Sequence, residues 1–183
     1  MLKSLLFALL LANPSPGLTG ASKVNDVLAR IKEPKQGNRE QKFVLSQHDL
    51  NEWAKIAIQS KERLGVKEVQ VELMETALIR GRAVINMDEV KLEGFAFRMF
   101  RAVLSGTQTL VADGRLIVGN GKGRYEVVSA RFNDVWVPAW LVTAVVSTLT
   151  KRQHPNVDIT EDFELPHGIR DIRVIPGKVE VVR

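Results

Sequence analysis

Residues 117–127, IVGNGKGRYEV, carry Gly119, Gly121 and Gly123 two positions apart, with a lysine and an arginine among them. Glycine-rich loops of this kind can cradle phosphate, so the first question is whether the chain binds a nucleotide. A dinucleotide fingerprint needs G-x-G-x-x-G between a strand and a helix, because the helix N-terminus meets the pyrophosphate. Here the third glycine comes one residue too soon, and the segment after it has the character of a strand. We therefore expect no nucleotide site.

Asn120 and Gly121 are instead the favoured residue pair for a type I′ turn between two antiparallel strands. If they are the two turn residues, Arg115 faces Glu126 and opposite charges meet on one side of the hairpin. The glycine run is therefore predicted to form the tip of a β-hairpin. On its apolar side the same register makes two facing pairs, Leu116 with Tyr125 and Gly114 with Val127.

The residue types that could support catalysis or bind a metal are scattered along the chain. The three histidines lack the H-x-x-x-H or H-E-x-x-H spacing that would place two imidazoles on one metal ion. There is no cysteine, and Ser105 in LSGT lacks the G-x-S-x-G pattern of a hydrolase nucleophile. Asp88, Glu89 and Asp158 have no calcium-loop spacing. We expect no metal, no cofactor and no enzyme; an active site would require carboxylates or histidines to meet in the fold.

The composition is that of one ordinary globular domain. The chain has 183 residues, of which 45% are hydrophobic and 26% charged, and a formal net charge of +5. A modest basic excess favours anionic partners. Because the arginines are scattered through predicted strands rather than gathered on one helix, we expect an anionic membrane surface rather than nucleic acid.

Residues 1–21 have the succession of a secretory signal peptide. A short basic start precedes the apolar run SLLFALLLA, and a helix-breaking segment of small residues leads to a cleavage site after Ala21. The apolar run is too short to span a bilayer. The alternative is a frayed N-terminal helix of a cytoplasmic protein. We predict export to the periplasm or the cell envelope.

Helical and strand periodicities alternate along the remaining chain. A short amphipathic helix and a linker are predicted within 22–40, and a single α+β domain with an antiparallel sheet across 41–183. Ser46 and Asp49 resemble a capping box that starts a longer helix, which Gly65 ends. A second helix is expected to follow Pro138. Their apolar stripes are Leu50, Trp53, Ala54, Ala57 and Leu64 in the first, and Val142, Val145, Val146 and Leu149 in the second.

The predicted turns leave two questions open. The strand around 69–73 returns as a strand around 83–87, through a turn near Arg80-Gly81 or one at Glu75-Thr76. The final two strands meet near Pro176-Gly177. Because Pro-Gly favours a type II turn, which suits a two-residue hairpin poorly, we expect a bulge or a wider turn there.

Residues 92–106, LEGFAFRMFRAVLSG, are unusually rich in aromatic and basic side chains. One interpretation is a membrane contact in which Phe97 and Phe100 enter the bilayer interface while Arg98 and Arg101 meet headgroups. The alternative is a segment buried on both sides, or a strand with its apolar residues inward.

The element order, with LSQHDLNEWA, GRAVINM, the passage GRLIVGNGKGRYEVVSARFNDVWVPAWLV and the closing ELPHGIRDIRVIPGKVEV, resembles small bacterial envelope proteins of the tubular lipid-binding (TULIP) class. The resemblance covers most of residues 42–183. It implies a curved antiparallel sheet that wraps one or two long amphipathic helices and encloses an apolar groove for a lipid chain. This chain has one domain's worth of residues, fewer than the long forms. The implied groove residues are Trp53, Ala57, Leu116, Tyr125, Trp140, Val145 and Leu149.

Two functions follow as expectations. The first is an exported, non-enzymatic protein that binds or presents a lipid-like hydrophobic ligand at the cell envelope. The second is a structural or interaction module of the envelope whose sheet holds only its own helix. They differ in packing, because a carrier's groove leaves space whereas the core of a scaffold is close-packed.

Overall fold

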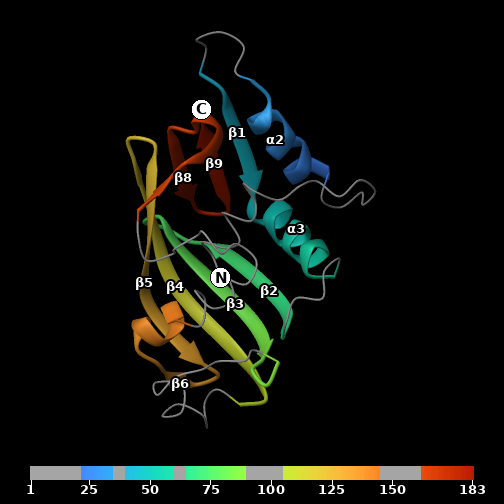
Figure 1. Ribbon diagram of the computed structural model, residues 1–183, viewed down its shortest axis with the longest axis vertical. Helices are drawn as coiled ribbons and strands as arrows, with labels where there is room; N and C mark the ends of the chain where they lie inside the picture. The colour runs from blue at the N-terminus through green and yellow to red at the C-terminus, as the bar shows by residue number, and fades with distance from the viewer. Residues whose placement is uncertain (1–21, 35–39, 60–64, 90–104, 145–161) are drawn as a thin grey trace.

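The computed structural model describes residues 22–34, 40–59, 65–89, 105–144 and 162–183. These form an α+β fold with two antiparallel sheets, a larger one of six strands and a smaller one of three (Figure 1). The elements in chain order are α2 (Ser22–Lys32), β1 (Lys42–Ser46), α3 (Gln47–Gln59), β2 (Val66–Leu73), β3 (Leu78–Asn86), β4 (Thr107–Gly119), β5 (Lys122–Phe132), β6 (Val135–Trp136), β7 (Phe163–Glu164), the 3₁₀ turn η2 (Pro166–Gly168), β8 (Asp171–Ile175) and β9 (Lys178–Val182).

The larger sheet runs in the order β2-β3-β4-β5-β6, with β7 paired to the other end of β5, and it curls into a half-barrel (Figure 1). A β-bulge lies in the β4–β5 pair next to Gly114, where bulges increase twist and bend a sheet. The Tyr125 ring covers Gly114 so closely that a Cβ on the glycine would overlap it. Glycine at this position therefore leaves the space that the Tyr125 ring fills.

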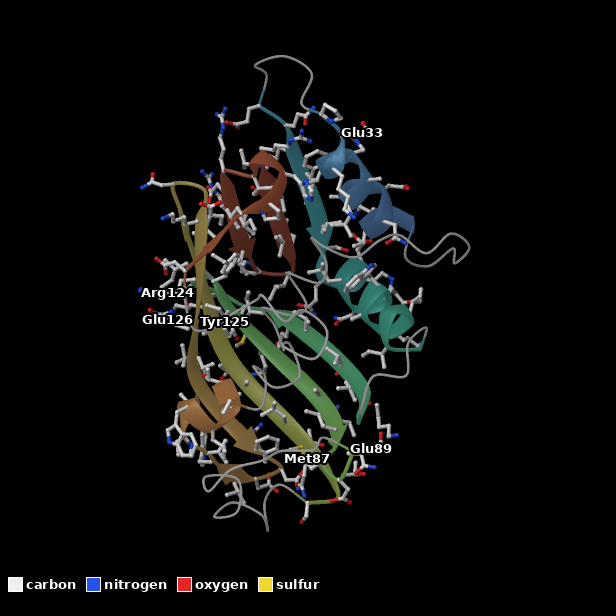
Figure 2. All side chains as sticks on the ribbon, in the orientation of Figure 1. Glu33, Met87, Glu89, Arg124, Tyr125 and Glu126 are labelled. Atoms are coloured by element: carbon white, nitrogen blue, oxygen red, sulfur yellow. The ribbon has the colours of Figure 1, made fainter. Side chains whose placement is uncertain are left out.

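The β4–β5 hairpin confirms the predicted register. Asn120 and Gly121 both have positive φ, 53° and 73°, as a type I′ turn requires. Arg115 faces Glu126, and the other two predicted pairs are also formed. Figure 2 shows the alternation along β5, where Arg124 and Glu126 lie on one side of the strand and Tyr125 on the other. The ion pair made by Glu126 is with Arg124 on its own strand, at 3.0 Å.

The β2–β3 connection is the turn at Glu75-Thr76, the second of the two predicted alternatives. Thr76 and Ala77 both have φ of 58°, and the Met74 N–H donates to the Leu78 carbonyl at 2.8 Å. The other alternative, Arg80-Gly81, lies inside β3 and pairs on both sides.

The smaller sheet has the order β1-β9-β8 and lies at one end of the larger one (Figure 1). The prediction of a bulge or a wider turn at Pro176-Gly177 is wrong, because Ile175 pairs directly with Lys178 and only two residues connect the strands. Two contacts hold this turn. The Gly177 N–H donates to the Leu73 carbonyl at 3.0 Å, and its carbonyl accepts from the Gln47 N–H at 2.7 Å. The tertiary hydrogen bonds therefore stabilise a turn that local preference disfavours.

Helix α3 begins at the predicted capping box. The Ser46 N–H donates to Asp49 Oδ2 at 2.9 Å, and the Asp49 N–H donates to Ser46 Oγ at 3.1 Å. The expected long helices are not found in the described residues, where α2 has 11 residues and α3 has 13. A further helical segment is described over 139–144. Short helices of this kind depend on packing against the sheets rather than on their own propensity.

The core joins both sheets and α2. Four of the five apolar residues of α2, Val24, Val27, Leu28 and Ile31, are buried in the same cluster as the strands, and Ala29 is exposed. The Arg183 guanidinium fixes the end of this helix, because Nη1 donates to the carbonyls of Arg30 (3.0 Å) and Ile31 (2.9 Å). Cations are favoured at a helix C-terminus.

Candidate functional site

The residues predicted to contact a ligand occupy different environments. Trp53 and Leu116 are buried in the core, and Tyr125 packs against it opposite Leu116. Trp140 lies in the 139–144 helix with 51% of its surface exposed. Six other predicted residues, and the side chain of Ala57, lie outside what the structure describes; the six are Phe97, Arg98, Phe100, Arg101, Val145 and Leu149.

The inner face of the larger sheet is apolar and has small residues at its centre. Gly81 on β3, Ala112 on β4 and Ala130 on β5 face one another across the strands, and we call them the inner row. The rows on either side are mostly bulkier. One contains Ala83, Leu110 and Phe132, and the other contains Ile79, Gly114 and Val127. The inner row is therefore a band of small side chains across three strands, with bulkier neighbours on both sides at β5, and we call this band the trough.

Tyr125 is the ionisable side chain on the inner face of the hairpin. Burial raises the pKa of its phenol well above the ordinary range, and the negative charge of Asp113 raises it further. The phenol therefore stays neutral under all ordinary conditions. A neutral, largely buried ring suits an apolar surface.

On the outer face, four residues of β2 to β5 form a cross-strand network that we call the paired row (Glu72, Arg80, Asp113 and Ser129). Arg80 binds Asp113 through two hydrogen bonds, from Nε at 2.7 Å and from Nη2 at 3.1 Å. Ser129 Oγ donates to the same carboxylate at 3.0 Å. The Arg80 hydrogen bonds lower the pKa of Asp113, so the pair stays charged.

The next row of the outer face is different. Gln70, Arg82, Val111, Arg131 and Trp136 face one another in turn across β2 to β6, and we call them the open row. Arg82 and Arg131 are exposed, and neither forms an ion pair within the described residues. Val111 stands between them where the paired row has its carboxylate. The open row thus presents two cations and an indole with no ion-paired carboxylate in the described residues, although the charge of Arg131 helps to lower the pKa of Asp113 in the adjacent row.

The β6 end of this surface is apolar as well as aromatic. Trp136 is 68% exposed on the outer face, and Val128 is 55% exposed on β5, three residues before Arg131. Val135, which faces Phe132, is 51% exposed on the opposite face of β6. Trp140 follows directly in the 139–144 helix. The outer face at β6 therefore presents one large exposed aromatic ring, that of Trp136.

A groove of about 410 Å³ lies between α3 and β2. Beside it, α3 closes the edge of β2 through two amide side chains one turn apart. Asn51 accepts from the Val71 N–H at 2.7 Å, and Gln47 accepts from the Leu73 N–H at 2.8 Å. These contacts protect an edge strand from pairing with another chain. The groove itself is lined largely by charged and amide side chains of α3 and β2.

In the described part of the chain, no group of three or more histidine or acidic side chains could hold a metal ion. His48 and His167 are exposed and far apart in sequence, and His154 lies outside that part. Glu89 binds Lys67 at 3.1 Å and the Gly65 N–H at 3.0 Å at the lower end of the sheet in Figure 2. These hydrogen bonds, chiefly that from Lys67, lower the pKa of Glu89, which has a structural role at the end of the β2–β3 pair.

Among the described residues, no helix is both long and apolar enough to cross a bilayer. No protein-family model, no curated protein and no solved structure matches this chain. The candidate surfaces must therefore be judged by their own geometry. Sequence reasoning named the hairpin residues of the inner face but missed the open row, since its members come from five separate strands.

Proposed function

We propose that this chain is an exported, non-enzymatic protein that binds a lipid-like hydrophobic ligand along the inner face of its curled sheet. The observation that supports this most is the inner row, where Gly81, Ala112 and Ala130 lie side by side on three strands. Small residues between bulkier rows let a cylinder of acyl-chain width approach the backbone. The resemblance to tubular lipid-binding proteins supports the same proposal.

The chemistry of the inner face restricts the ligand to an apolar one. The inner positions of β3, β4 and β5 carry no charged side chain in the described residues. A charged or strongly polar ligand would lose its hydration there without gaining partners. An acyl chain loses nothing comparable and gains about 0.8 kcal/mol for each methylene that it buries. The neutral Tyr125 ring adds a flat apolar wall beside the trough.

A second candidate function, a structural or interaction module without a ligand, is favoured by one observation. Ala130 is only 2% exposed, and Ile79, Ile85 and Phe132 are completely buried. The trough is thus covered within the protein. If the protein is a structural module, its own side chains fill the trough permanently. If it is a lipid carrier, a bound ligand displaces some of the side chains that cover the trough.

Filling the trough distinguishes the two functions. Ala112→Leu adds a branched side chain to the centre of the inner row, and Val84→Leu is the matched control on the outer face of the neighbouring strand. We expect native mass spectrometry of gently purified wild type to show a bound lipid mass, and Ala112→Leu to lose it while the control keeps it. Wild type and Val84→Leu should also take up a fluorescent fatty acid, and Ala112→Leu should not.

Ligand-free wild type that takes up neither fatty acid nor phospholipid would support the module. In that case Ala112→Leu should destabilise the fold by about 1–3 kcal/mol, because it overpacks a filled core. Thermal unfolding of the same three proteins measures this.

Export needs its own test, because it rests on residues 1–21. N-terminal sequencing of protein from the native host should show a chain that begins near residue 22. Recovery from the cytoplasm of a chain that still begins at Met1 would contradict the proposed export.

A further inference from the structure

We propose that the open row is a docking surface for an anionic phospholipid bilayer, with Trp136 entering the interface and Arg131 and Arg82 binding lipid phosphates. This rests on the proposed function for its compartment and ligand class. It concerns the outer face of the sheet, however, and not the inner face that would hold the ligand. The protein would then meet the membrane with one face of the sheet and bind lipid with the other.

The spacing of the row suits several headgroups at once. Arg82 and Arg131 lie on β3 and β5, with β4 between them, so their backbones are about 10 Å apart. Trp136 is one strand beyond Arg131. The three side chains project from the same face because each faces the next across the sheet. Because the sheet is curled and this is its outer face, the long Arg82 and Arg131 side chains must reach around the curve to contact the same membrane as Trp136.

The charge of the row favours an anionic partner. Asp113, a carboxylate in the adjacent row, is already held by two hydrogen bonds from Arg80. Arg82 and Arg131 form no ion pair in the described residues, so most of their positive charge is available, although Asp113 lies close enough to Arg131 for that charge to lower its pKa. Guanidinium groups bind phosphate oxygens in pairs, which makes arginine well suited to headgroups.

The apolar end of the row favours a membrane over a nucleic acid. Trp136 offers a large apolar ring with one N–H, the amphipathic form that places tryptophan at membrane interfaces. Val128 adds an exposed aliphatic side chain on β5, three residues before Arg131. Aliphatic side chains gain free energy from acyl chains but not from phosphate or base edges. A single-strand nucleic acid site would instead interleave several aromatics with the cations.

The test uses vesicles of mixed phosphatidylglycerol and phosphatidylcholine, with pure phosphatidylcholine vesicles for comparison. We expect the wild type to cosediment with the anionic vesicles only, and more weakly as salt screens the arginines. Arg82→Gln and Arg131→Gln should each weaken vesicle binding about fivefold, and the double variant about 25-fold. Trp136→Ser should weaken it by roughly tenfold or more, because an interfacial ring is lost. Brominated lipid should quench the tryptophan fluorescence of the wild type more than that of Trp136→Phe.

Arg173→Gln is the matched control, because it removes one exposed arginine from β8 in the other sheet. It should change vesicle binding by less than about twofold. All these positions are exposed, so thermal unfolding should show that the variants fold. An equal loss with Arg173→Gln would overturn the assignment to the open row, and absence of wild-type binding, or equal binding to neutral vesicles, would overturn the proposal itself.

Two further outcomes have defined meanings. If a single-stranded oligonucleotide binds in a manner that depends on Arg82 and Arg131, and vesicles do not bind, the partner of the open row is nucleic acid and not a membrane. Ala112→Leu separates this proposal from the proposed function, since it fills the inner trough and leaves the outer face unchanged. If Ala112→Leu loses its lipid ligand but still binds vesicles, the two activities are independent. If the wild type binds vesicles but never carries a ligand, only the proposed function fails.

Discussion

The paired row and the open row cross the same face of the same sheet, two residues apart on most strands, and use arginine in opposite ways. In the paired row, Arg80 faces Asp113 and is held by two hydrogen bonds. In the open row, Arg82 and Arg131 both face Val111. The facing residue on the neighbouring strand therefore decides whether an arginine holds strands together or remains available to a partner. Arginine content alone does not reveal which.

The two rows also differ in what they contribute to stability. The Arg80–Asp113 pair is partly buried on the carboxylate side, and charge-assisted hydrogen bonds there stabilise the pairing of β3 with β4. The open row stabilises nothing comparable, because its cations face water. Changes in the paired row should thus be seen in unfolding experiments, and changes in the open row in binding experiments. Val111→Glu and Asp113→Asn each convert one row toward the other, whereas acid and Ser129→Ala act on the paired row alone.

The largest effect is expected from Val111→Glu. A carboxylate at this position would lie between Arg82 and Arg131 and could pair with both, giving the open row the arrangement of its neighbour. Both cations would be neutralised, so vesicle binding should fall about 25-fold or more. Val111→Gln introduces a side chain of nearly the same shape as glutamate but without its charge, so this variant should retain most of the vesicle binding. Cosedimentation with anionic vesicles measures both; similar losses in the two variants would show that charge is not the cause.

The opposite conversion is Asp113→Asn. It leaves Arg80 with only the exposed Glu72 carboxylate, 3.9 Å from Nη1, so the free energy of unfolding should fall by about 1 kcal/mol, a modest value because Arg80 is partly exposed. The released guanidinium should at the same time strengthen vesicle binding about fivefold. Urea denaturation and cosedimentation measure the two effects. Lower stability with unchanged binding would mean that Arg80 lies outside the membrane contact.

Acid should reveal the same pair in the wild type. Hydrogen bonds from Arg80 lower the pKa of Asp113 below its usual value of about 3.9 in an unfolded chain. The stabilisation from this group is therefore complete above about pH 4 and is lost as the pH falls through the lower folded pKa. The stability difference between wild type and Asp113→Asn should narrow below about pH 4. Comparing the two proteins removes the contribution of Asp49 and Glu180, whose pKa values are also lowered.

Much of the fold could be predicted because the decisive interactions are local. Asn120-Gly121 specifies a turn by its backbone preferences, and the turn fixes the register of the strands that leave it. Ser46 and Asp49 likewise start α3 through contacts within three residues. The Pro176-Gly177 prediction failed because hydrogen bonds from β2 and α3, distant in sequence, override the local preference.

The candidate surface could not be predicted for a related reason. Counting pairs from the Asn120-Gly121 turn alone would place Asp113 opposite Val128, but the bulge shifts the partner to Ser129. A shift of one residue exchanges the faces of a strand, and it brings Arg131 to the outer face. The turn between β2 and β3 decides which residue of β2 faces Arg82, and the sequence is compatible with two positions for this turn. Both rows therefore depend on irregularities that leave no clear pattern in the sequence.

The smallest effect is expected from Ser129→Ala, which sharpens the contrast between the rows without converting either. Ser129 Oγ donates one hydrogen bond to the Asp113 carboxylate, and removing it leaves both Arg80 hydrogen bonds in place. The free energy of unfolding should fall by about 0.5 kcal/mol, the lower end for a single hydrogen bond at a partly exposed site. Arg80 stays occupied, so vesicle binding should not change. If Ser129→Ala strengthened vesicle binding as much as Asp113→Asn, the serine rather than the carboxylate charge would be holding Arg80 away from the membrane, and the distinction between a paired and an open arginine would lose its electrostatic basis.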